Sequence, residues 1–314
     1  MSYTRPMPAI AVIGSIVADI VVQTPRLPRS GENLHAKRIR VMPGGKAANA
    51  AVAFTRLGGR AYLLGNTGSD AFAAMARQAL EQEGVSISTV RADPEHPTGS
   101  GILLVEATGQ TAFIIDPGAN LTLPVAWVEE ALRPLLPVLD GLLFNFEAPE
   151  ACLLRAVELA RAHNLPVFVD AGPARPYTPV LWQGAAVLTP NQAEAEAMVG
   201  YSLAESAAAE QAARQLLEQG ARTVVLKMGG RGALVAQDRK LWWSPAFPVQ
   251  VVDSAGDGDA FTAGLVLALL EGRSLADAVV YANACGAIAA ARAGTMVSMP
   301  TAAEVAALLR GSRV

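Results

Sequence analysis

The sequence predicts an α/β protein with a mostly parallel central sheet flanked by helices, and a small β-sheet beside it. Short runs of β-branched residues alternate with Ala- and Leu-rich helical segments that end near Gly or Pro. Examples are a helix expected at 150–163 before the strand Val167–Asp170, and a helix expected at 204–219 before the strand Thr223–Lys227. This order is typical of βαβ units, whose parallel strands share one sheet covered on both faces.

Two regions interrupt the alternation and carry no helical pattern. Within 15–43 and 98–117, extended segments separated by turns are expected at 18–23, 34–41, 101–106 and 111–116. We expect these two insertions to form the small β-sheet, standing off the main sheet. The rest of the 314 residues can form one main α/β domain. This main domain comprises residues 1–14, 44–97 and 118–314.

The opening apolar run at 9–22 is predicted to be strand rather than a signal peptide, because β-branched residues dominate it and Gly14 and Asp19 interrupt it. No run reaches the ~20 apolar residues that a membrane span needs. Cys152 and Cys285 lie in apolar helical patterns without metal-ligand spacing. We therefore expect a soluble cytoplasmic protein with two buried, reduced thiols and no membrane partner.

The composition is that of a packed globular protein, since 52% of the residues are hydrophobic and 17% are charged. The net charge is −3, and no basic run stands out. Nucleic acid is therefore not expected as a partner. A nicotinamide dehydrogenase also fits poorly, because Gly14 is not followed by a Gly-x-Gly-x-x-Gly pattern.

The segment 253–261, Asp-Ser-Ala-Gly-Asp-Gly-Asp-Ala-Phe, places a glycine-rich turn before an apolar helix expected from about Ala260 to Gly272. The first turn of a helix has unpaired amides, and Gly256 and Gly258 let an anion approach them. Asp259 beside them suits a proton acceptor, as phosphoryl transfer to a hydroxyl requires. The alternative is an ordinary glycine turn with Asp as a helix cap.

A second glycine turn opens another helix at 42–49, which reads Met-Pro-Gly-Gly-Lys-Ala-Ala-Asn. It is not a P-loop, because position 40 is Arg where the Walker spacing needs Gly, and no Ser or Thr follows Lys46. The turn instead presents Lys46 and Asn49, about one helical turn apart, to a polar ligand.

Together these segments resemble the two signatures of the ribokinase-like sugar kinases, the phosphofructokinase-B family. The resemblance covers nearly the whole chain, and Pro-Gly-Gly-Lys and Pro-Ala-Arg are closest to its ribokinase branch. It implies an ATP-dependent kinase that phosphorylates a primary hydroxyl of a small sugar, ribose or a related pentose or ketose. The matching motifs are 10–14 with Asp19, 44–49, 116–120, 146–149, 170–175, 189–194, 227–232 and 253–261.

The resemblance implies that Asp259 is the general base and that the backbone of the preceding turn stabilises charge on the phosphoryl group. That turn includes Gly256, Asp257 and Gly258. Asp257 departs from the family, which usually has a small residue there. Because a carboxylate beside a phosphate is unfavourable, we expect only its backbone to act and its side chain to turn away.

The resemblance assigns sugar binding to acceptors and donors suited to vicinal hydroxyls. These residues are Asp19, Gly45, Lys46, Asn49, Glu147 and Asp259. Ribokinases typically carry Asn two positions before the first of them, where this chain has Val17. The substitution removes one hydroxyl partner and weakens the case for ribose itself.

ATP is implied as the nucleotide, with Asn191, Lys227, Gly229, Gly232, Gly258 and Asn283 at its site. Glu194 is implied to organise Mg²⁺ through water. A K⁺ site is implied at Asp253, Ala255, Gly294 and Ser298. For Asn191 and Glu194, the alternative is an ordinary first helical turn after Pro190.

In the family the small sheet is a lid over the sugar and often the dimer contact, so a homodimer through the lid is implied. Pairing of two lids would also cover exposed strand edges.

Two other functions stay open. A nucleoside kinase of the same superfamily would need an aromatic partner for the base. A catalytically silent sugar sensor is disfavoured because Asp259 and Asn191 are both present.

Overall fold

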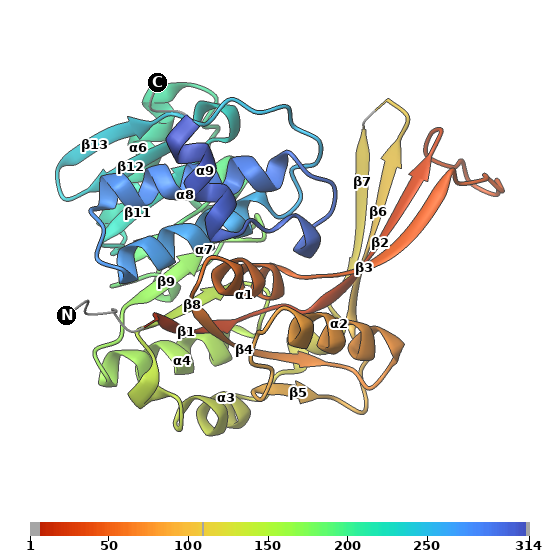
Figure 1. The fold of residues 1–314 in the computed structure, drawn as a ribbon, viewed down its shortest axis with the longest axis horizontal. Coiled ribbons are helices and arrows are strands. Elements are labelled where there is room, and N and C mark those ends of the chain that lie inside the picture. The colour runs from red at the N-terminus through yellow and green to blue at the C-terminus, as the bar shows by residue number, and fades with distance from the viewer. Residues whose placement is uncertain (1–6, 109, 312–314) are drawn as a thin grey trace.

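The computed structural model describes residues 7–108 and 110–311, which form an α/β/α sandwich with a separate small sheet (Figure 1). The large sheet is parallel except at one edge, where two strands are added antiparallel. The predicted fold class is therefore confirmed. In spatial order the strands are β13 (Lys240–Ser244), β12 (Ala233–Gln237), β11 (Thr223–Lys227), β10 (Val187–Leu188), β9 (Val167–Asp170), β8 (Gly141–Asn145), β1 (Ala9–Ile13), β4 (Arg60–Thr67) and β5 (Val90–Ala92).

Two apolar cores lie on opposite faces of this sheet. Alternate residues of β1 enter different cores, with Ile10 and Val12 in one and Ala11 and Ile13 in the other, because successive strand side chains point to opposite faces. The first core is completed by α1 (Lys46–Arg56), α2 (Ala71–Gln82), α7 (Asp257–Leu270), α8 (Leu275–Ala290) and α9 (Ala302–Gly311). The second is completed by α3 (Val125–Leu132), α4 (Glu150–Ala162), α5 (Gln192–Val199) and α6 (Ser206–Glu218).

The helix expected from about Ala260 to Gly272 begins earlier than predicted. α7 starts at Asp257 rather than near Ala260, after Gly256 with φ 83°. The apolar periodicity starts only at Ala260, because the first turn of α7 lines a cavity instead of packing in the core. The helices expected at 150–163 and 204–219 are present as α4 and α6, with ends shifted by one or two residues.

The small sheet, here called the lid, projects from the main body (Figure 1). Its order is β3 (Arg38–Gly44), β2 (Val17–Thr24), β6 (Gly99–Glu106) and β7 (Thr111–Asp116), so two separate parts of the chain contribute strands to it. The strand expected at 34–41 was misplaced. It runs from Arg38 to Gly44 because it pairs with β2 along that length, from Gln23↔Arg38 to Val17↔Gly44.

Cys152 and Cys285 are buried and unpaired, as expected. Within residues 7–108 and 110–311, no helix has the length and hydropathy that a membrane crossing requires. Short 3₁₀ helices occupy Gly118–Thr122, Leu136–Val138, Pro179–Leu181, Gly229–Arg231 and Met296–Ser298.

Candidate active site

A cavity of about 1000 Å³ lies at the carboxyl ends of the parallel strands, between the lid and the first turns of α1 and α7. Parallel sheets commonly bind ligands at this edge. Most residues predicted for the site lie in its wall: Asp19, Gly45, Lys46, Asn49, Glu147, Asn191, Lys227, Gly229, Gly232, Ala255, Gly256, Asp257, Gly258, Asp259 and Asn283. Four others lie outside the wall: Glu194, Asp253, Gly294 and Ser298.

The glycine turn before α1 brings this helix against the lid. A Cβ on Gly44 would lie 2.0 Å from Asp19 Oδ2, so this glycine makes room for the carboxylate. Gly45 has φ 102°, which favours glycine. The turn therefore lets α1 present Lys46 and Asn49 next to a lid carboxylate.

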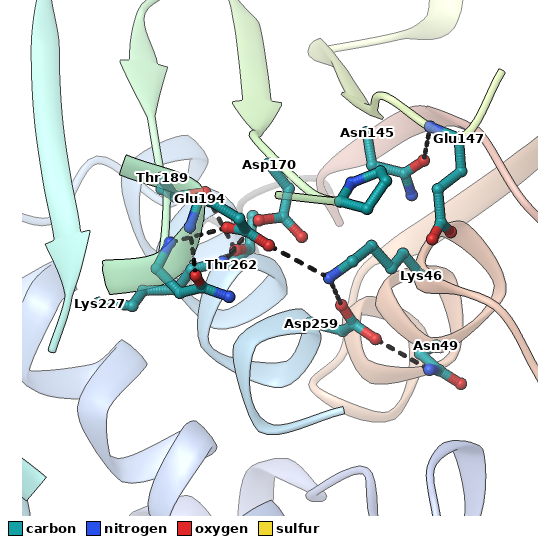
Figure 2. A network of polar contacts seen from close by, with 12 residues as sticks. Lys46, Asn49, Asn145, Glu147, Asp170, Thr189, Glu194, Lys227, Asp259 and Thr262 are labelled. Atoms are coloured by element: carbon teal, nitrogen blue, oxygen red, sulfur yellow. Dashed lines mark hydrogen bonds and ion pairs between the residues drawn. The ribbon is translucent and has the colours of Figure 1, made fainter. Parts of the chain in front are cut away.

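Asp259, in the first turn of α7, is only 3% exposed (Figure 2). Asn49 Nδ2 donates to Asp259 Oδ2 at 2.8 Å, and Lys46 Nζ lies 3.6 Å from Oδ1. Burial raises the pKa of Asp259. The positive charge of Lys46 lowers this pKa, and the negative charge of Asp170 raises it further. A carboxylate with a raised pKa and fixed partners is suited to accept a proton.

Lys46 lies between carboxylates that come from three different elements (Figure 2). Its Nζ is 3.7 Å from Glu194 Oε1 in addition to the contact with Asp259. Burial alone would lower the pKa of Lys46, but Asp259, Asp170 and Glu194 hold it well above its ordinary value. The ammonium group therefore stays charged within the cavity wall.

Glu147 follows β8 and is tied to the start of α1. Ser15 Oγ donates to Glu147 Oε2 and accepts a hydrogen bond of 3.0 Å from the Lys46 amide. Asn145 Oδ1 accepts from the Glu147 amide at 3.0 Å. Burial raises the pKa of Glu147, whereas Lys46 and Ser15 lower it.

Asp19 reaches the cavity from β2 in the lid. Burial raises its pKa to about 6, the hydrogen bond from Thr295 lowers it, and Asp259, Glu147 and Asp253 raise it further. Thr295 was not singled out from the sequence. Its partner lies 276 residues away, and no local pattern links two such positions.

Asp257 lies in the cavity wall, and the direction of its side chain stays a prediction. Burial raises the pKa of its carboxyl to about 6, whereas Lys227 and the Gly258 amide lower it, and Asp259 raises it. Burial therefore disfavours the ionised form of this carboxyl, whereas an ammonium group and an amide of the helix start favour it.

Lys227, at the end of β11, forms a buried ion pair with Asp170, at the end of β9 (Figure 2). Lys227 Nζ lies 2.5 Å from Asp170 Oδ1 and would lie 3.3 Å from a Cβ on Gly258. Asp170 belonged to a recognised motif but was not predicted as a site residue. Its position at the carboxyl end of a buried strand is the feature of the sequence that could have identified it as a site residue.

Beyond Lys227, the wall is formed by the turn 229–232 and the segment after β13. A Cβ on Gly232 would lie 2.1 Å from Ser244 O, so these backbones touch. Asn283 Nδ2 donates to Ser244 Oγ at 3.0 Å and to Pro245 O at 3.2 Å. Asn283 thus braces the wall of this half of the cavity.

Asn191 and Glu194 form a capping box at the start of α5. Asn191 Oδ1 accepts from the Glu194 amide at 2.8 Å, and Glu194 Oε2 accepts from the Asn191 amide at 2.7 Å. The helix-start alternative is therefore present in the structure. Glu194 is nevertheless only 2% exposed and reaches Lys46 with its other oxygen.

Three of the four residues predicted to hold K⁺ are joined at Asp253, and the fourth, Ser298, bonds to the residue after Gly294. Its carboxylate accepts from the Ala255 and Gly294 amides, both at 3.0 Å, and Ser298 Oγ donates to Thr295 O at 2.7 Å. Among the residues that the structure describes, no three His, Cys, Asp or Glu side chains are grouped to hold a metal ion.

A buried carboxylate beside the free amides of a helix start can take a proton from an alcohol while those amides bind a phosphoryl group. This combination defines a phosphotransferase with an alcohol acceptor. The family model for pfkB family carbohydrate kinases matches residues 7–302, and the chain belongs to this family.

Individual relatives agree with the family match. A ribokinase of Haemophilus influenzae is 30% identical over 295 residues, which are 94% of this chain and 96% of the relative. A ribokinase of Bacillus subtilis is 32% identical over 301 residues, 96% of this chain and 99% of the relative. The solved structure of Arabidopsis thaliana ribokinase with ribose and ATP is 29% identical, with a TM-score of 0.89 and coverage of 97% and 99%.

Proposed function

We propose that this protein is an ATP-dependent kinase that phosphorylates a primary hydroxyl of a small sugar, with ribose or a related pentose or ketose as the acceptor. The observation that carries the proposal is the pairing of Asp259 with Asn49. Asn49 Oδ1 is buried without a hydrogen-bond partner among the described residues, although its Nδ2 holds the base. A sugar hydroxyl that donates to this oxygen would lie beside Asp259 and satisfy an acceptor that is otherwise costly to bury.

In the proposed reaction, Asp259 accepts the proton of the primary hydroxyl as its oxygen attacks the γ-phosphorus of ATP. The new O–P bond forms while the bond from the γ-phosphorus to the bridging oxygen breaks, and ADP leaves with that bonding pair. The turn 256–258 and Lys227 face the phosphoryl group and offset its charge. Closure of the lid would exclude water from this step.

Sugar recognition is proposed for the half of the cavity next to the lid. Asp19 and Glu147 offer acceptor oxygens, Lys46 offers a fixed ammonium, and the Gly45 backbone completes the wall. The nucleotide is proposed for the other half, lined by Asn191, Gly229, Gly232 and Asn283. The support is geometric, since both halves open onto Asp259 in one cavity.

Mg²⁺ would be held mainly by phosphate oxygens and water, where it supplies charge neutralisation for the transferring group. Glu194 fits an indirect role only, because both of its carboxylate oxygens already contact the Asn191 amide or Lys46.

Activity should require Mg²⁺ and should rise when K⁺ replaces a bulky organic cation at the same ionic strength. The Asp253 carboxylate is used by two amides, so backbone carbonyls near Gly294 and Ser298 would be the K⁺ ligands. Initial rates in KCl and in tetramethylammonium chloride give the comparison. Equal rates in the two salts would contradict the proposed K⁺ site but not the assignment of the protein as a kinase.

The sugar kcat/KM should fall as the pH drops below about 6. Asp19 has a pKa of about 6, and protonation removes one of its acceptors. Because this pKa lies above its unfolded value of 3.8, ionisation of Asp19 lowers folding stability as the pH rises between these values. Low pH therefore weakens sugar recognition, although the protonated form of Asp19 stabilises the folded state.

The pH profile of Asp19→Asn separates the effect of Asp19 from those of Asp257 and Asp259. The pKa values of these two carboxyls are also raised, so their protonation can also lower the rate at acidic pH. The variant should have a higher sugar KM that depends less on pH between 5 and 7, roughly the range around the parent's transition. An unchanged acidic limb would assign that limb to another carboxyl.

A homodimer through the lid is proposed because the lid exposes apolar side chains. Ile39, Ile114 and Ile115 are 60–65% exposed, and apolar strand surfaces of this kind favour pairing with another chain. Sedimentation velocity measures the mass in solution, and a monomer at all concentrations would contradict the proposal. We also place the protein in the cytoplasm, in line with its two unpaired cysteines.

A nucleoside acceptor is the second candidate, because the lid residue Phe113 lines the cavity and is available to stack on a base. ADP release from a panel of sugars and nucleosides decides between the candidates. Turnover with a pentose or ketose supports the main proposal, preference for nucleosides supports the second, and absence of turnover with every acceptor supports a silent sensor.

A further inference from the structure

Thr295 makes a long-range contact with the lid that the proposed mechanism does not yet use. Its Oγ1 donates to Asp19 Oδ2 at 3.0 Å. Among the described residues, it is the side chain that donates a hydrogen bond to this carboxylate. Burial raises the pKa of Asp19, and the negative charges of Asp259, Glu147 and Asp253 raise it further. Thr295 is therefore the local group that favours the ionised, acceptor form.

The contact leaves the two oxygens of Asp19 in different settings. Oδ2 lies in the space created by Gly44, where a Cβ would be 2.0 Å from Oδ2 and 3.2 Å from Thr295 Oγ1. Oδ1 faces Gly101 at the cavity wall, where a Cβ would be 3.5 Å away. One oxygen is thus held by protein, and the other remains for a ligand.

The backbone of Thr295 also packs against the turn that begins α7. A Cβ on Gly256 would lie 3.5 Å from Thr295 Cα and 3.6 Å from its carbonyl oxygen. Ser298 Oγ donates to that oxygen at 2.7 Å, and the neighbouring Gly294 amide donates to Asp253. These bonds fix the segment, so the Thr295 hydroxyl is presented to the lid from a rigid support.

We propose that Thr295 is a positioning residue for sugar recognition, which holds one oxygen of Asp19 so that the other binds the acceptor sugar. The residue also joins the lid to the phosphoryl-binding turn of α7. This inference rests on the proposed function, because it takes Asp19 as a sugar ligand. Hydroxyl chemistry carries the role, and the methyl group of Thr295 is not required for it.

The test replaces Thr295 with Val, which keeps the shape and removes the donor. The sugar KM should rise about tenfold or more, as expected for loss of a hydrogen bond to a charged group. The values of kcat and of the ATP KM should change little. Thr295→Ser restores the hydroxyl and should recover most of the sugar affinity. Thr55→Val is the matched control, because Thr55 Oγ1 donates to Ala51 O within α1.

A double-mutant cycle makes the assignment specific. In an Asp19→Ala background, Thr295→Val should not weaken sugar binding further, because the two residues act through one contact. A sugar KM unchanged by Thr295→Val would overturn the inference. A change confined to kcat and the ATP KM would also overturn it, because Thr295 would then only support Gly256. A Thr295→Ser variant as impaired as Thr295→Val would overturn it as well.

Calorimetric titration with the sugar separates this inference from the proposed function, since it needs no turnover. A parent protein that binds a sugar but does not transfer phosphate would contradict the kinase proposal. In that case weaker binding by Thr295→Val still supports the positioning role. A parent that binds none of the sugars would overturn both.

Discussion

Replacing Asp259 with Asn should lower kcat at least a hundredfold while the protein still folds and binds sugar. A positioned general base contributes roughly 10²–10⁴ in rate, and the amide of Asn cannot accept the hydroxyl proton. The fold should persist because Asn has nearly the same shape, and Lys46 keeps its second carboxylate neighbour, Glu194, at 3.7 Å. Single-turnover and steady-state measurements of ADP formation give the result.

Asp277→Asn is the control for this experiment. Asp277 also lies in the first turn of a helix, α8, but it pairs with Ser274 at an exposed position outside the cavity wall. Its substitution should leave turnover unchanged. Near-parent turnover in purified Asp259→Asn would rule out Asp259 as the base.

Replacing Asp19 with Ala should raise the sugar KM strongly and change the ATP KM little. A hydrogen bond to a charged group is worth roughly 1.5–3 kcal/mol, so losing one contact should weaken sugar binding about tenfold to a hundredfold. Asp19 is expected to carry a large share of recognition because Val17, two residues earlier on β2, offers no hydrogen bond from its side chain.

Asp116→Ala is the matched control on the lid. Asp116 ends β7 and accepts from the Gly118 amide at 2.9 Å in an exposed setting, so sugar KM should not change. If Asp19→Ala instead raised the ATP KM and left the sugar KM unaltered, the two halves of the cavity would be assigned the wrong way round.

Much of the fold follows from local sequence patterns. The alternation of β-branched runs with Ala- and Leu-rich segments predicted the parallel sheet, and the absence of helical periodicity in two regions predicted the lid. The predicted ends of some helices and strands were wrong, because contacts distant in the sequence determine where these elements begin and end. The first turn of α7 is polar because it faces the cavity, and β3 extends to Gly44 because it pairs with β2.

The site was predictable where its residues cluster along the chain. The turns at 44–49 and 253–261 each place glycines and functional side chains within a few positions. Asp170 and Thr295 were missed as site residues because their roles depend on partners 57 and 276 residues away.

The most direct test of the account is the product formed from ATP, Mg²⁺ and ribose by the purified protein, with related pentoses and ketoses assayed in parallel. Phosphorus NMR and ADP quantification together measure where the phosphoryl group goes. The account predicts one ADP for each sugar phosphate, with the phosphoryl group on a primary hydroxyl and no such product from Asp259→Asn. ATP hydrolysis without sugar phosphate, or no turnover with any of these acceptors, would contradict it.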